Sequence, residues 1–102
     1  MKHWVEVAGL EDIPRLQARL VKTGYHNLAV FRTASDEVFA VEDDCPHKHG
    51  PLSQGVVHDN LVTCPCHNLE IDLASGRVLG SDEDYTRTFR TRVKSGRIYL
   101  SL

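Results

Sequence analysis

Cysteine is scarce in this chain of 102 residues, which has only three. An odd and small number of thiols argues against a secreted fold stapled by disulfides and favours a reducing compartment. No apolar run reaches the 18 residues that a membrane span needs, and the N-terminal segment lacks the apolar core of a signal peptide. We therefore expect a cytoplasmic protein that does not act at a membrane.

An excess of charge of one sign is also missing, as are the short motifs of nucleotide-binding enzymes. Twelve basic and 14 acidic residues leave a net charge of −2, so no nucleic-acid partner is expected. The chain has no Gly-rich dinucleotide fingerprint, no P-loop, and no nucleophile with a paired base. We predict no catalytic residues: the chain is at most a component of an enzyme and has no complete active site of its own.

Two short boxes with metal-binding side chains are what the sequence does contain. They are Cys45-Pro46-His47 and Cys64-Pro65-Cys66-His67. A Rieske [2Fe-2S] centre needs two thiolates on one iron and two imidazoles on the other, and each box supplies one Cys and one His at the required short spacing. The predicted ligands of this cofactor and its metal ions are Cys45, His47, Cys64 and His67.

A structural zinc site is the chemical alternative, because two Cys and two His form a common tetrahedral set for zinc. Zinc sites of this type normally join a closely spaced Cys pair to a later His pair. Here each box holds one residue of each type, and this interleaving favours iron and sulfur over zinc.

The pattern of apolar residues predicts an all-β fold of stacked antiparallel sheets. Most of the chain alternates between apolar and polar residues or contains short apolar runs bounded by turns. Only 13–20 has possible helical spacing, and Pro14 limits it to a short turn. The ranges expected in strands are 4–7, 27–32, 37–41, 56–57, 61–62, 69–73, 86–93 and 97–102, with the last two paired as a hairpin.

One domain is expected over residues 1–102, with a cluster-binding subdomain of two loops at about 43–73. Between the boxes, the order of residues predicts loop, strand, turn, strand and loop, with the turn at 58–60. The acidic run 42–44, just before the first box, favours a solvated turn.

The run from Cys45 to Val78, CPHKHGPLSQGVVHDNLVTCPCHNLEIDLASGRV, resembles the cluster-binding part of Rieske ferredoxins. The whole chain is most similar to the small subunit of assimilatory NAD(P)H-dependent nitrite reductase, whose members have CPHK-x-GPLSQG in the first box. Asn68 follows the second His, a place that Gly usually takes in the ferredoxins of ring-hydroxylating dioxygenases. The tail, an acidic turn followed by a final hairpin, also resembles the nitrite reductase family.

This resemblance implies a Rieske-type fold and an electron-transfer subunit that works with a large partner. The partner would be the nitrite reductase subunit that contains flavin, siroheme and a [4Fe-4S] cluster and reduces nitrite to ammonium. Cys45 and Cys64 would hold the buried iron, and His47 and His67 would lie at the exposed tip. A free Rieske ferredoxin that serves a terminal oxygenase remains an alternative, and a structural zinc module is a second.

Departures from the high-potential Rieske proteins of cytochrome bc complexes predict a low reduction potential. Those proteins join their cluster loops by a disulfide, but Gly50 takes the place of one of its cysteines, so Cys66 has no partner. Leu69 and Ile71 replace the hydroxyl residues that donate hydrogen bonds to the cluster sulfurs. Because such bonds stabilise the reduced cluster, we expect a value near the low end of the range of roughly −150 to +300 mV.

Overall fold

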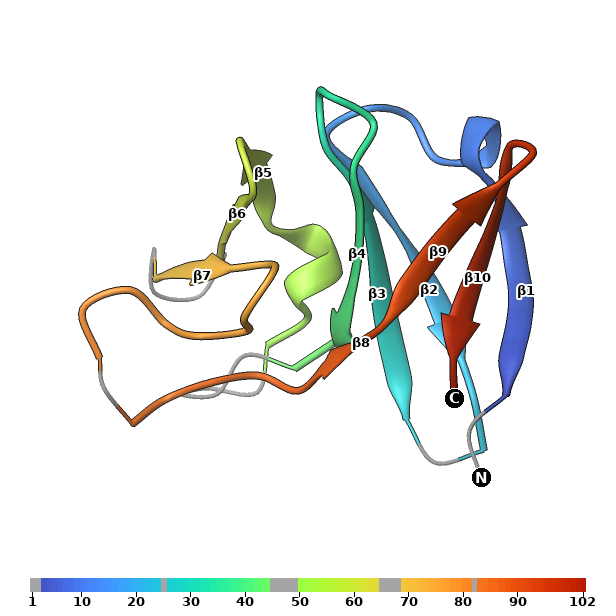
Figure 1. Ribbon diagram of the computed structural model, residues 1–102. Coiled ribbons are helices and arrows are strands. Elements are labelled where there is room, and N and C mark those ends of the chain that lie inside the picture. Colours follow the sequence, from blue (N-terminus) through green and yellow to red (C-terminus); the bar gives the residue numbers. More distant parts are fainter. Residues whose placement is uncertain (1–2, 25, 45–49, 65–68, 82) are drawn as a thin grey trace.

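Three antiparallel sheets make up the fold (Figure 1). The computed structural model describes residues 3–24, 26–44, 50–64, 69–81 and 83–102. The first sheet has the order β1 (Trp4–Gly9), β10 (Arg97–Ser101), β9 (Thr91–Lys94). The second has the order β2 (Gln17–Lys22), β3 (Asn27–Arg32), β4 (Val38–Glu42), β8 (Thr88–Phe89), and the third has the order β5 (Val56–His58), β6 (Leu61–Thr63), β7 (Glu70–Asp72).

The described part of the chain contains no α-helix, which confirms the all-β prediction. Two single turns of 3-10 helix join strands: η1 (Leu10–Asp12) follows β1, and η2 (Leu52–Gln54) precedes β5. Within the same described ranges, no helix is long and apolar enough to cross a membrane.

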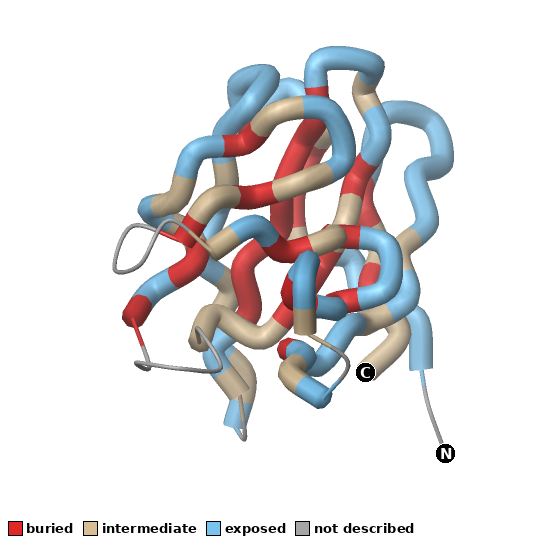
Figure 2. The backbone as a smooth tube through the Cα atoms, turned by 90° about the vertical axis from the view of Figure 1, so that its left-hand side faces the viewer, coloured by how far each residue is buried: buried red, intermediate tan, exposed pale blue. Residues whose placement is uncertain are grey.

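The second sheet lies in the middle of the molecule, and both of its faces are covered. Ala29, Phe31 and Val41 face a core shared with the third sheet, whereas Leu28 and Val30 face a core shared with the first. This arrangement explains why β3 is a continuous apolar run rather than an alternating one, since a strand buried on both faces has no polar side. Figure 2 shows the resulting buried stretches behind the exposed turns of the third sheet.

The third sheet and η2 adjoin both boxes along the chain. The first box, 45–47, lies between the end of β4 and η2, and the second, 64–67, lies between β6 and β7. β5 pairs with β6 across a tight turn in which Asp59 has a φ of 52°, a left-handed conformation that Asp tolerates better than most residues. The predicted strand–turn–strand between the boxes is therefore confirmed, although His58 belongs to the strand rather than the turn.

Two strand predictions differ from the structure. The predicted final hairpin is only half correct: β9 pairs with β10, but β8 pairs with β4 in the second sheet. The chain changes sheets at Arg90, and an alternating pattern shows which face of a strand is buried but not which neighbour it pairs with. Residues 13–20 contain more than a short turn, because β2 begins at Gln17 and pairs along its length with β3.

Candidate metal centre

Of the four predicted ligands, Cys64 belongs to the described part of the structure. Cys45, His47 and His67 lie outside the described residues, and so does Cys66. The ligand set therefore stays a prediction. What the structure does describe is the set of chain segments that enter and leave each box, together with the contacts that hold them.

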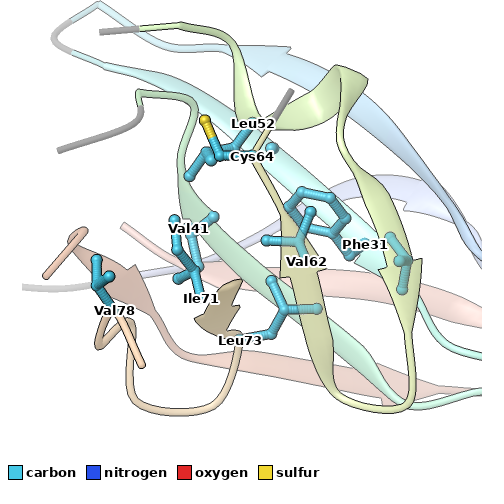
Figure 3. Close-up of a cluster of buried hydrophobic side chains, with 10 residues drawn as sticks. Phe31, Val41, Leu52, Val62, Cys64, Ile71, Leu73 and Val78 are labelled. Carbon is cyan, nitrogen blue, oxygen red and sulfur yellow. The ribbon is translucent and has the colours of Figure 1, made fainter. Parts of the chain in front are cut away.

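Cys64 lies directly after β6 and is fully buried, with 0% of its surface exposed. Its side chain belongs to the core between the second and third sheets, where Figure 3 shows it beside Leu52. The backbone N–H of Cys64 donates to the carbonyl of Leu69 at 2.7 Å. The two flanks of the segment 65–68 are thus tied together at its base.

A thiol in this position fits the buried end of an iron–sulfur cluster. Iron binds the thiolate, and an apolar surrounding keeps water and competing ligands away from it. Cys64 is a free cysteine, so no disulfide competes for its sulfur. The neighbouring side chains in the core are apolar: Leu52, Val62 and Ile71.

The chain that enters the first box is held by contacts on two sides. On one side, the Asp43 carboxylate accepts hydrogen bonds from the Ser53 backbone N–H at 2.6 Å and from the Ser53 hydroxyl at 3.0 Å. On the other, the Thr86 hydroxyl lies 3.2 Å from the Glu42 carbonyl and 3.4 Å from the Asp44 carbonyl. The Asp43 N–H also donates to the Asn27 carbonyl at 2.8 Å, which continues the sheet past the end of β4.

These contacts correct one expectation from the sequence. The acidic run 42–44 is not simply a solvated turn, because Glu42 ends β4 and Asp43 is partly buried and accepts two hydrogen bonds from Ser53. The sequence holds little signal for this pairing, since the two residues are ten positions apart on either side of the box. Pro51 precedes η2, and its side chain cannot cap the turn. This is the one local indication that a residue elsewhere supplies the cap.

Two of the described histidines make side-chain contacts outside the boxes. His26 Nδ1 lies 3.3 Å from Glu42 Oε1, and His58 Nε2 lies 3.0 Å from the Thr63 hydroxyl. Within the described ranges, His, Cys, Asp and Glu side chains form no group of three that could hold a metal ion.

Comparison with protein families decides what kind of domain these segments build. The family model of the Rieske-like [2Fe-2S] domain matches residues 3–101. The chain belongs to this family. The cofactor of this Rieske domain is accordingly a [2Fe-2S] cluster, and the buried Cys64 thiol suits it. The match also favours the iron–sulfur interpretation of the boxes over the zinc alternative.

Relatives of this Rieske domain include ferredoxins of oxygenase systems. This chain is 34% identical over 98 residues to the ferredoxin subunit of 3-phenylpropionate/cinnamic acid dioxygenase from Photorhabdus laumondii. The match covers 94% of this chain and 91% of the relative. Among solved structures, the complex of oxygenase and ferredoxin in carbazole 1,9a-dioxygenase contains a chain that matches with a TM-score of 0.83 and 28% identity, covering 94% of this chain and 99% of that one.

A solved structure from Mycobacterium tuberculosis, provisionally named as the small subunit of an NADH-dependent nitrite reductase, has the same fold. Its TM-score is 0.91 over 100% of this chain and 96% of that chain, at 21% identity. At this identity, the likeness concerns the fold alone. The electron-transfer role of this Rieske domain follows from its family and not from this likeness.

Proposed function

We propose that this chain is the electron-transfer small subunit of an NAD(P)H-dependent nitrite reductase, which reduces nitrite to ammonium. The observation that carries the proposal is the composition of the two boxes. The first reads CPHK-x-GPLSQG, and Asn68 follows the second His where oxygenase ferredoxins usually have Gly. The acidic turn and final hairpin of the tail support the same family, and the shared fold with the Mycobacterium tuberculosis protein agrees with it.

In this proposal Cys45 and Cys64 bind one iron, and His47 and His67 bind the other. The cluster, when bound, accepts and releases one electron. Burial of Cys64 in the core supports its role as an anchor of the inner iron. The two imidazoles then face outward, where a partner's redox centre comes within electron-transfer distance.

The remainder of the proposal concerns organisation and setting. Residues 1–102 form one Rieske domain in the cytoplasm, with the subdomain at about 43–73 presenting the cluster. The third sheet and η2 lie within this range. The partner is the large subunit with flavin, siroheme and a [4Fe-4S] cluster, which takes electrons from NAD(P)H and performs the chemistry on nitrite.

A low potential suits an electron carrier between a flavin and siroheme. Ile71, one of the two residues in place of a hydroxyl donor, is fully buried and pairs with Val62 across β6 and β7. Leu69 packs against the same core. Neither side chain can donate a hydrogen bond to a cluster sulfur, so the reduced state lacks that stabilisation.

Co-purification with the large subunit tests the proposal. The chain is produced together with the siroheme subunit and isolated by a tag on either protein. We expect a stable complex that reduces nitrite with NAD(P)H and shows the rhombic EPR signal of a reduced Rieske cluster. A chain that has the cluster but neither binds the large subunit nor changes its activity would refute the nitrite reductase role.

Transfer of electrons to a terminal oxygenase is the second candidate. It is favoured by the 34% identity, over nearly the whole chain, to the dioxygenase ferredoxin from Photorhabdus laumondii. A free ferredoxin is reduced rapidly by a flavoprotein reductase without forming a stable complex. The same purified protein, tested with such a reductase in place of the siroheme subunit, separates the two candidates.

A further inference from the structure

Asp43 stands where the chain leaves β4 for the first box, two residues before Cys45. Ser53 stands where the chain returns, in the 3-10 turn η2. Their two hydrogen bonds, at 2.6 and 3.0 Å, close the loop that contains the box at its base. A carboxylate that accepts from a backbone N–H and a hydroxyl at these distances makes strong, charge-assisted bonds.

The Asp43 carboxylate caps η2 from a distant part of the sequence, in place of the residue that directly precedes the turn. The residue before η2 is Pro51, and it makes no side-chain capping hydrogen bond. The Ser53 N–H is among the first backbone donors of η2, which have no acceptor inside the turn. The Asp43 carboxylate, ten residues away, supplies that acceptor.

The η2 turn is also fixed against the second box. Leu52 is fully buried in the core that contains Cys64. Directly after η2, Gly55 lies so close to β6 that an added Cβ would meet the Thr63 carbonyl oxygen at 2.5 Å. β6 leads directly into Cys64. The contact of η2 with β6 therefore connects the chain that leaves the first box to the chain that enters the second.

We propose that Asp43 and Ser53 are a positioning pair that fixes the first cluster loop relative to Cys64. The pair acts through the backbone on either side of the box and needs no contact with the cluster. The inference rests on the ligand set of the proposed function but not on the identity of the enzyme served. The hydroxyl of the buried Thr86 donates to the carbonyls on both sides of Asp43 and so helps to hold the chain that enters the first box.

The expected consequence of the pair is slower loss of the cluster. Iron leaves a protein site through local openings that expose the ligands to solvent, and every bond broken in the opening makes it rarer. Loss of both Asp43 bonds therefore raises the population of the open loop. The expected effect is cluster loss about ten-fold faster than in the wild type.

The test compares Asp43→Ala with Asp12→Ala in the purified holoprotein. Asp12 is a matched control because its carboxylate also accepts a backbone N–H, that of Gly9 at 2.8 Å, beside a 3-10 turn in the other part of the fold. The readouts are the decay of the visible absorbance of the cluster with an iron chelator and the thermal midpoint of unfolding. Asp43→Ala should lose the cluster about ten-fold faster, while Asp12→Ala stays within about two-fold of the wild type.

Two further variants separate geometry from charge. Asp43→Asn retains an oxygen that accepts from the Ser53 N–H, and its amide can donate to the Ser53 hydroxyl oxygen. It should keep the wild-type EPR line shape and lose the cluster clearly more slowly than Asp43→Ala, although faster than the wild type because its bonds are no longer charge-assisted. Ser53→Ala removes only the hydroxyl bond and should accelerate loss about two- to three-fold.

The positioning role is overturned if Asp43→Ala and Asp12→Ala lose the cluster at the same rate. It is also overturned if Asp43→Asn loses it as fast as Asp43→Ala, since charge rather than geometry would then matter. A wild-type protein that contains no iron and shows no Rieske EPR signal after reconstitution would instead refute the ligand set, and this outcome is seen before any variant is compared.

Discussion

One aspartate precedes β4 and another follows it. The groups that donate hydrogen bonds to these two carboxylates differ in charge. Before the strand, Asp36 accepts from the guanidinium groups of Arg15 and Arg32, with Nε–Oδ1 distances of 2.8 and 2.9 Å. After it, Asp43 accepts from the neutral N–H and hydroxyl of Ser53. Among the described residues, no cation lies within ion-pair distance of Asp43.

This difference contrasts an end of β4 that joins segments of the fold with an end that leads into the first box. At Asp36 opposite charges cancel, and the buried Arg32 also donates to the Leu10 and Ile13 carbonyls, so the network holds a connection between strands. At Asp43, by contrast, no cation among the described residues offsets the negative charge, and the chain leads from there into a loop that is expected to hold a redox centre. A nearby negative charge disfavours the addition of an electron, which agrees with the low potential predicted from Leu69 and Ile71.

Acidic and basic residues are unevenly distributed between the part of the chain with the two boxes and the last strands. Residues 36–84, which include both boxes, contain 11 of the 14 acidic residues and only two of the 12 basic ones. Residues 85–102 contain five basic residues and no acidic one. The part of the chain with the two boxes is therefore electronegative, whereas the last strands are electropositive.

The largest expected effect comes from removing a predicted ligand of the cluster. Cys64→Ser should abolish the visible absorbance and EPR signal of the cluster and lower the thermal midpoint, because metal binding contributes directly to folding. Cys66→Ser is the control: this cysteine has no predicted role as ligand, so its variant should stay red-brown. Iron content and EPR after identical reconstitution measure both. Loss of the cluster in the Cys66 variant as well would contradict the predicted ligand set.

A steric change between η2 and β6 should have the next largest effect. Gly55 has a φ of −76°, which any residue can adopt, so the constraint at this position is space alone. An added Cβ would meet the Thr63 carbonyl oxygen at 2.5 Å and Val62 Cγ2 at 2.7 Å. Gly55→Ala should therefore lower the free energy of unfolding by about 2 to 3 kcal/mol and accelerate cluster loss.

Gly24→Ala is the control for that substitution, because nothing lies within 4 Å of its added Cβ. Its free energy of unfolding should change by less than about 1 kcal/mol. Chemical denaturation of the two variants side by side gives the comparison. Equal stability would show that the close approach of η2 to β6 is not a constraint.

A hydroxyl near the second box should shift the reduction potential without unfolding the protein. We expect the wild type to have a potential near the low end of the Rieske range, and a value above about +100 mV would contradict the argument. Leu69→Ser introduces a donor at one of the two positions where high-potential relatives have a hydroxyl, so its potential should rise. Leu79→Ser, at an exposed position, is the control and should leave the potential unchanged in a redox titration.

The smallest expected effect lies at Asp36, before β4, and depends on pH. Hydrogen bonds from Arg15 and then Arg32 hold the pKa of Asp36 below its ordinary value of 3.8. A lowered pKa in the folded state stabilises the protein above the pKa of the unfolded chain, and this contribution disappears as the pH falls through the folded-state pKa. Asp36→Asn should therefore flatten the loss of stability below about pH 4.

Denaturation midpoints measured from neutral pH down to about pH 2 test this prediction. Glu37→Gln, which removes an exposed carboxylate from the same turn, is the control. If both variants show the same slope in acid, the ion pairs of Asp36 do not stabilise the fold. Neither variant should change the rate of cluster loss, because the pair at Asp43 is left intact.

Local pattern predicted most of the strands, since alternation and short apolar runs depend only on near neighbours in the sequence. It placed the hairpin of β3 and β4, the strands between the boxes and the strand at 70–72. It did not predict that β8 pairs with β4 or that β2 forms along β3. Those pairings depend on which sheet edge is free, which the pattern of one strand does not contain.

The two boxes by themselves determined the class of cofactor, because two Cys and two His in this interleaved order match few other metal sites. The tertiary structure alone decided that Cys64 is fully buried in the core beside Leu52, and that Asp43 reaches Ser53 across the first box. Ligand types are a property of composition and spacing, whereas burial and the closure of a loop require segments distant in sequence to pack together. The sequence predicted the metal-binding groups, and the fold decided how the segments that flank them are held.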